Sequence, residues 1–304
     1  MSDARRSAGT LMRGPILVLA GGICIGFAPI GLRLGLDELG PQAIAFWRYG
    51  FAVPVLYALA VILQRRQPAR PNRFVIIAGT CFALDIALWH WGLERTTVAN
   101  ATFIVNLGNI SVGLLAWAVL GERPSLAWAA AFTAALAGAG LLSLGGGQSG
   151  QGDLVGDLLS LGAAVMVSGY VLASALSRRT LSGIDAIFWL TVVELCVGGM
   201  VLLVSGEPLL PVSAGGFAAP LFLALVVQVG GQGLILTGLG HTPPAMAGVL
   251  VLVQPVAAAL ISWQLFGEVL TTLQVFGAGL ILTGVYIAQR RARPSEAVSE
   301  PERS

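Results

Sequence analysis

Ten runs of mainly apolar residues follow one another along the chain, and they constrain its fold more than any other feature. A helix needs about 20 such residues to cross a bilayer, and each run approaches that length. Only 11% of the residues are charged, against the roughly 25% that a soluble domain carries. The sequence therefore predicts an all-α integral membrane protein with ten transmembrane helices. The runs are Pro15–Gly35, Pro41–Leu63, Phe74–Leu93, Val98–Leu120, Leu126–Leu144, Leu154–Leu176, Ile184–Ser205, Phe217–Leu239, Pro244–Phe266 and Leu273–Ala288.

The distribution of arginine sets the orientation of these helices. Every basic residue counted among Lys and Arg is Arg, and with a cytoplasmic N-terminus 14 of the 17 fall on the cytoplasmic side. Cytoplasmic loops are enriched in this way, so we expect both termini inside, with residues 1–14 as a cytoplasmic start and 291–304 as a disordered cytoplasmic tail. Exclusive Arg usage suggests a GC-rich bacterial genome, hence the inner membrane. The arginines form no patch that predicts nucleic-acid binding.

The two halves of the chain repeat each other. Residues 92–122 align with residues 238–268 without a gap, at an offset of 146 residues. Identical pairs include Thr96 with Thr242 and Trp117 with Trp263. The alignment divides the chain into five-helix repeats at 15–146 and 147–290. Because five is odd, the second copy enters the membrane inverted, a plan that recurs in secondary transporters.

Two short motifs end the repeated segments at matching places, and two others stand in the first half. They are Ala45–Gly50 (AFWRYG), Thr96–Ala101 (TTVANA), Gly121–Arg123 (GER) and Gly267–Val269 (GEV). Over nearly its whole length the chain resembles the EamA-type members of the drug/metabolite transporter superfamily. The resemblance implies a secondary transporter of small metabolites, such as amino acids, nucleotide-linked metabolites or drugs, working by alternating access between the repeats, with export favoured. The second half departs from the pattern: Leu190 stands in the place of Arg48, and Pro243-Pro244 replace Thr97-Val98.

Five polar residues from five predicted helices reach similar depths near the middle of the membrane. Burying an ionisable side chain there costs about 2.5–3.5 kcal/mol on insertion scales, so each needs a partner, water or substrate. We expect these residues to contribute to a central cavity. Asp85 can anchor a substrate ammonium, exchange a proton, or hydrogen-bond to Asn106. The five residues are Asp85, Asn106, Glu194, Gln228 and Gln254.

Helical spacing adds four further candidates for substrate contact. Trp89 is four residues from Asp85 and shares its face, whereas His90 does not. The spacing also puts Asn109 on the face of Asn106, and Gln232 on the face of Gln228. For Trp89 and His90, the alternative to substrate contact is a position in the belt of aromatic side chains at the membrane surface. For the amides the alternative is hydrogen bonding between helices.

Five residues are candidates for gating or structural roles. Pro29 and Pro255 break the backbone ladder, and Pro255 is expected to leave a carbonyl free at midplane depth. Arg48 either pairs with Asp37 or Glu38 as an outer gate or extends to the membrane surface. Glu122 and Glu268 end their repeats and fit a cap, a turn or a gate.

Other classes of protein explain less of the sequence. An intramembrane enzyme lacks a recognisable motif, because the one G-x-G-D pattern, Gly150–Asp153, lies in the polar linker between the halves. The two His and three Cys have no metal-ligand spacing, so we expect no catalytic residue, metal or cofactor. A scaffold or receptor would explain the helices but not the midplane polar layer. The expected partners are a small-molecule substrate and the lipid bilayer, with proton coupling and a homodimer left open.

Overall fold

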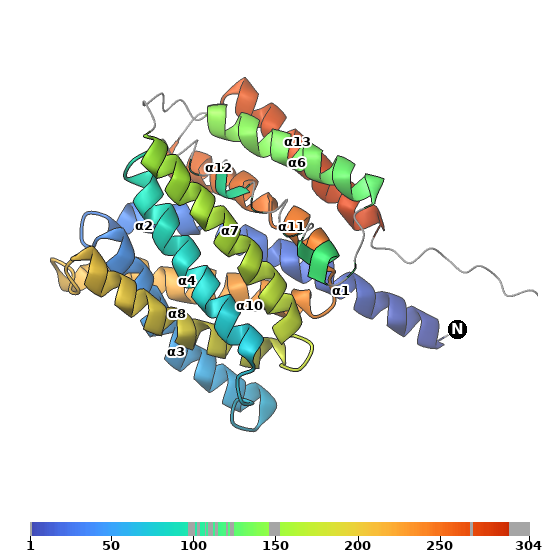
Figure 1. The fold of residues 1–304 in the computed structure, drawn as a ribbon, viewed down its shortest axis with the longest axis horizontal. Helices are drawn as coiled ribbons and strands as arrows, with labels where there is room; N and C mark the ends of the chain where they lie inside the picture. The colour runs from blue at the N-terminus through green and yellow to red at the C-terminus, as the bar shows by residue number, and fades with distance from the viewer. Residues whose placement is uncertain are drawn as a thin grey trace, which may run out of the picture.

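The computed structural model of the chain is a bundle of helices (Figure 1). It describes residues 2–96, 101, 104–106, 108, 112, 115–119, 121, 125–145, 153–267 and 270–291. Every regular element in those ranges is a helix, which confirms the predicted all-α class.

Seven helical segments in the described part of the chain are long and apolar enough to cross a membrane: 14–35, 41–64, 73–93, 154–177, 183–205, 214–239 and 244–266. Four are single helices, namely α3 (Pro41–Gln64), α4 (Arg73–Leu93), α7 (Leu154–Ser177) and α8 (Gly183–Ser205). Two shorter apolar helices accompany them, α6 (Leu126–Gly145) and α13 (Thr272–Arg291). The chain is therefore a multi-pass membrane protein. The predicted run Val98–Leu120 lies mostly outside the described residues.

The other three segments are interrupted. The first consists of α1 (Ser2–Ile25) and α2 (Ala28–Gly35), which begins with Pro29 in its first turn. The segment at 214–239 consists of η1 (Ala214–Phe217), α9 (Ala218–Phe222), the π-helix η2 (Leu223–Gln232) and α10 (Gly233–Leu239). The segment at 244–266 consists of α11 (Pro244–Leu250) and α12 (Val253–Phe266).

The two prolines lie where a helix resumes after an interruption. Pro lacks a backbone N–H and is tolerated in a first turn, where that donor has no helical partner. The expected free carbonyl is not found at Pro255. The carbonyl four residues earlier, that of Val251, accepts a hydrogen bond from the Gln254 backbone N–H at 3.0 Å. The local turn therefore satisfies the acceptor that proline leaves.

Small residues let the backbones of paired helices approach closely. In Figure 1, α6 and α13 lie side by side along one edge of the bundle. Gly138 on α6 packs on Gly277 and Ile281, and Gly284 on α13 packs on Ala131 and Ala135. A later residue of one helix thus meets an earlier residue of the other, so the two helices run antiparallel. Close contact of small residues is a common way for membrane helices to associate.

The same kind of contact recurs in two other helix pairs. On α4, Gly92 packs against Gly156 and Ser160 of α7. On α10, Gly238 packs against Gly14 and Val18 of α1. Gly92 and Gly238 are 146 residues apart, the offset of the sequence repeat. The repeated sequence therefore makes repeated helix contacts.

The glycines of the GER and GEV motifs also share one conformation. Gly121 has φ +74° and Gly267 has φ +68°, both in the left-handed region that glycine adopts most readily. The backbone N–H of each donates to the carbonyl of the paired tryptophan, Trp117 at 3.0 Å and Trp263 at 3.1 Å. Each glycine thus ends its helix with the same left-handed cap. The neighbouring Glu122 and Glu268, predicted as caps, turns or gates, lie outside the described residues.

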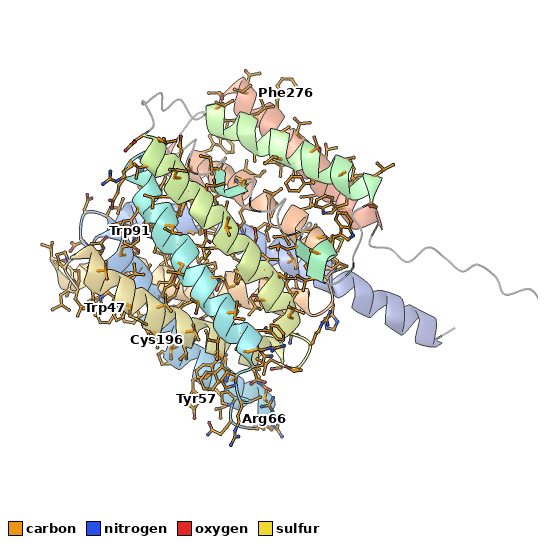
Figure 2. All side chains as sticks on the ribbon, in the orientation of Figure 1. Trp47, Tyr57, Arg66, Trp91, Cys196 and Phe276 are labelled. Atoms are coloured by element: carbon orange, nitrogen blue, oxygen red, sulfur yellow. The ribbon has the colours of Figure 1, made fainter. Side chains whose placement is uncertain are left out.

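Large apolar side chains cover much of the outer surface. Leu203 on α8 is 85% exposed and Phe276 on α13 is 67% exposed. Figure 2 shows Phe276 at the outer edge of the bundle. An apolar surface of this extent suits contact with lipid.

Asp185 fastens the connection between α3 and α4 to the start of α8. Its buried carboxylate accepts hydrogen bonds from Gln64 Nε2 at 3.0 Å, Arg66 Nη2 at 2.7 Å, the Ala69 backbone N–H at 3.2 Å and Ser182 Oγ at 2.7 Å. Figure 2 shows Arg66 at this end of α3. Hydrogen bonds to a charged group are stronger than those between neutral groups. One carboxylate therefore joins the start of α8 to the connection between α3 and α4.

Substituting Gly284 should loosen the contact between α6 and α13. A Cβ at Gly284 would lie 2.9 Å from Ala135 Cβ and 3.0 Å from its backbone nitrogen, whereas a Cβ at Gly279 meets nothing within 4 Å. We expect Gly284→Val to lower the free energy of unfolding by about 1–3 kcal/mol, as overpacking does. Gly279→Val, on the same helix, is the matched control. Equal thermal midpoints for the two variants in detergent would contradict this contact.

Substituting Asp185 should weaken the contact between the start of α8 and the connection between α3 and α4. We expect Asp185→Asn to lower the free energy of unfolding by about 1–3 kcal/mol, because donors that face the carboxylate lose a charged acceptor. Asp153→Asn is the control, since Asp153 is exposed, lies 3.8 Å from Arg95, and caps α7 in a way that Asn reproduces. Thermal unfolding in detergent measures both. A larger loss for Asp153→Asn would refute the role given to Asp185.

Candidate functional site

A chain of buried hydrogen bonds crosses the middle of the bundle. Arg48 Nε on α3 donates to Gln228 Oε1 on η2 at 2.9 Å. Gln228 Nε2 lies 2.6 Å from Glu194 Oε2 and 2.8 Å from Thr191 Oγ1, both on α8. Side chains from three helices, one in the first half of the chain and two in the second, thus meet at one amide.

The π-helix η2 presents two glutamines to this cluster. Gln228 and Gln232 are fully buried and four residues apart, and Gln228 Nε2 lies 2.8 Å from Gln232 Oε1. π-Helical segments are rare and occur frequently at functional sites. Gln228 Nε2 has two hydrogens, yet three acceptors lie within reach of it. The three acceptors must therefore share the two hydrogens.

Arg48 lies inside the bundle and makes no gate pair. Its side chain is 6% exposed, and its guanidinium carbon lies 5.6 Å from the centre of the Tyr49 ring and 5.8 Å from that of Phe82. Glu38 instead accepts hydrogen bonds from the backbone N–H and the hydroxyl of Ser213, each at 2.8 Å. The expectations that Arg48 pairs with Asp37 or Glu38, or reaches the membrane surface, are therefore wrong, since Arg48 is buried and Asp37 is exposed. Gln228, a neutral acceptor on a facing helix, holds it at depth.

Several buried polar atoms around the cluster lack a hydrogen-bond partner among the described residues. They are Tyr49 Oη, Asp85 Oδ1, Tyr170 Oη, Glu194 Oε1 and Gln232 Nε2. Arg48 lies against the rings of Tyr49 and Phe82, and Phe82 packs on Tyr170, so these groups surround one region. Leaving a buried polar group unsatisfied costs about 1–3 kcal/mol. Such a concentration of unmet hydrogen bonds is suited to receiving a polar ligand.

Four of the residues predicted to contact substrate come together here. Glu194, Gln228 and Gln232 are joined by hydrogen bonds, and Asp85, 5% exposed, lies one helical turn after Phe82, whose ring packs on Tyr170. Asp85 Oδ1 is buried without a hydrogen-bond partner among the described residues, and the hydrogen bond of Asp85 to Asn106 stays a prediction.

The remaining predicted residues lie around the cluster or cannot be placed. Trp89 is half-buried, and its ring centre lies 5.5 Å from that of the buried His90. Half-buried Gln254 lies beside Gly22 of α1, and Asn106 is also half-buried. Asn109 lies outside the described residues.

The sequence alone did not single out Tyr49, Phe82, Tyr170 or Thr191. In the sequence, tyrosine and phenylalanine at these positions are typical of ordinary apolar contacts. In the structure, the rings of Phe82 and Tyr170 pack 4.9 Å apart. The depth of Arg48, eight residues into α3, was the signal that could have drawn attention to this region. Among the described residues, no group of three His, Cys, Asp or Glu side chains is arranged to hold a metal ion.

Comparisons with known proteins agree on one family. The model of the EamA-like transporter family matches residues 12–144 and again residues 154–289. The chain is 27% identical to "Uncharacterized transporter YwfM" of Bacillus subtilis over 73% of its own length and 76% of that protein. It is also 27% identical to the "Probable terminal-alkyne amino-acid exporter" of Streptantibioticus cattleyicolor, over 86% and 88% of the two chains. One crystal structure superposes with a TM-score of 0.78 at 18% identity, covering 92% of this chain and 98% of that one.

Proposed function

The chain belongs to the EamA-like transporter family, and we propose that it is a secondary carrier that moves small metabolites by alternating access. The observation that carries this proposal is the buried polar cluster around Gln228, built from both halves of the chain and only partly satisfied. A purely structural network would satisfy its own members. A carrier needs groups that a substrate completes.

We further propose ten transmembrane helices in two inverted repeats, 15–146 and 147–290. The family model matches once in each half, which supports a duplication. Inversion is supported by α6 and α13, the equivalent last helices of the two halves, because they run antiparallel. The repeated contacts of Gly92 and Gly238 agree with it. Two packings of one repeat give a carrier its two access states.

The proposed orientation has both termini on the cytoplasmic side of the bacterial inner membrane. The arginine distribution supports it, because Arg65, Arg66, Arg178 and Arg179 all belong to one side in that topology. The Asp185 contacts would then close the cytoplasmic end.

The substrate site in this proposal is the region around the central cluster. Its residues come from helices of both repeats, and the interruptions before Pro29 and Pro255 allow the helices beside it to bend. Glu122 and Glu268 are proposed to cap or gate their repeats. The proposed substrate contacts are Asp85, Trp89, His90, Asn106, Asn109, Glu194, Gln228, Gln232 and Gln254.

The substrate class proposed for export is an amino acid or related amphipathic metabolite. The relative named as an amino-acid exporter supports this choice, at 27% identity. Asp85 is proposed to hold the ammonium group of the substrate or a coupling proton, because one of its buried oxygens has no partner among the described residues. Either would compensate a carboxylate at this depth.

Transport by purified protein tests the function. Proteoliposomes offered a pooled cell metabolite extract should accumulate one compound class over empty liposomes, detected by mass spectrometry of the lumen. We expect Asp85→Asn to lower accumulation by about tenfold or more, because it removes a charge at the site. Asp153→Asn, the same change at an exposed cap, should transport normally.

Two outcomes would count against the proposal. No accumulation by folded wild type inserted in both orientations would favour a scaffold or receptor. Equal transport by wild type and Asp85→Asn would remove Asp85 from the site while leaving the carrier function intact.

A further inference from the structure

The buried cation and the buried anion of the cluster do not touch. Among the described residues, Arg48 and Glu194 are joined only through the amide of Gln228, which accepts from Arg48 at 2.9 Å and lies 2.6 Å from Glu194 through its nitrogen. A guanidinium can only donate and an ionised carboxylate can only accept, so the amide must turn its oxygen to Arg48 and its nitrogen to Glu194. A single neutral dipole therefore separates the guanidinium from the carboxyl group.

Both charges keep unused hydrogen-bonding capacity. A guanidinium has five N–H donors, yet among the described residues the Arg48 side chain makes one hydrogen bond, through Nε. Glu194 Oε1 is buried without a partner among those residues. No ion pair between Arg48 and Glu194 uses this capacity among the described residues, and Gln228 bonds to both instead.

We propose that Arg48 and Glu194 form a receptor for a dipolar substrate, with the amide of Gln228 standing in for that substrate when the site is empty. The carboxylate of the substrate binds the Arg48 guanidinium, and its ammonium group binds Glu194, which leaves the coupling proton as the role of Asp85. The amide has the same polarity, with an acceptor toward Arg48 and a donor toward Glu194. This inference rests on the proposed carrier function and names its substrate class as zwitterions.

The geometry also ties substrate binding to the contact between the halves. Arg48 comes from the first half, and Gln228 and Glu194 come from the second. A substrate that takes the place of the amide must break the bond between Arg48 and Gln228. The substrate then becomes the link between the halves, and a molecule with only one of the two charges cannot replace the amide on both sides.

Uptake sorted by charge tests the inference. A cell metabolite extract is separated by ion exchange into zwitterionic, cationic, anionic and neutral pools, and each pool is offered to proteoliposomes. We expect wild type to accumulate compounds mainly from the zwitterionic pool. Uptake mainly from another pool would overturn the inference and leave the carrier function standing. No uptake from any pool would defeat both.

Two variants should shift the preference in opposite directions. Arg48→Gln should lower the ratio of zwitterionic to cationic uptake by about 30-fold, and Glu194→Gln should lower the ratio of zwitterionic to anionic uptake similarly, as loss of a buried charge contact predicts. Arg73→Gln, at an exposed arginine, is the matched control. A merely structural role would reduce all pools together, so unchanged ratios in both variants would refute the receptor. If Arg48→Gln does not fold, Glu194→Gln alone decides.

Discussion

Hydrocarbon offers no hydrogen bond to a polar group, so every charge within the bundle depends on partners that the protein supplies. Arg48, Asp85 and Glu194 are all at least nine-tenths buried, and the helices around them are arranged to meet that demand only in part. Gln228 serves as acceptor for one charge and donor toward another, which a residue of a single polarity could not do. The centre of the protein therefore keeps buried polar atoms that have no hydrogen-bond partner among the described residues.

Close backbone packing provides the frame for this centre. Glycine at positions such as 92, 138, 238 and 284 brings paired helices into direct contact, and dispersion between backbones replaces the hydrophobic effect that lipid removes. The contacts within these helix pairs involve few polar side chains. Polar side chains can thus be concentrated at the ends, as at Asp185, and at the centre, as at Gln228.

The positions of the helices could be predicted closely from the sequence, because a bilayer imposes both the length and the apolar character of each run. The run Gly183–Ser205 begins within one residue of its predicted start, and α3 ends within one residue of its predicted end. The site was predicted less completely. Glu194 and Gln228 stood out as costly residues at depth. Tyr49 and Tyr170 resemble ordinary apolar contacts until their buried hydroxyls are seen, with the Tyr49 ring against Arg48. The prediction for Arg48 was wrong because the position of a residue along its helix does not determine which neighbour a long side chain contacts.

The two halves share the same close helix contacts and helix caps, whereas their buried polar residues at the centre differ. The contacts of Gly92 and Gly238 and the left-handed caps at Gly121 and Gly267 recur in both halves. At the centre the halves differ. Leu190 of the second half stands in the place of Arg48, and Phe82 of the first half stands in the place of Gln228, 146 residues later. A symmetric centre would present two cations or two amides to each other and would satisfy neither. Divergence at these positions lets one half contribute the cation and the other the amide and the carboxylate, so that the polar centre depends on both halves being packed together.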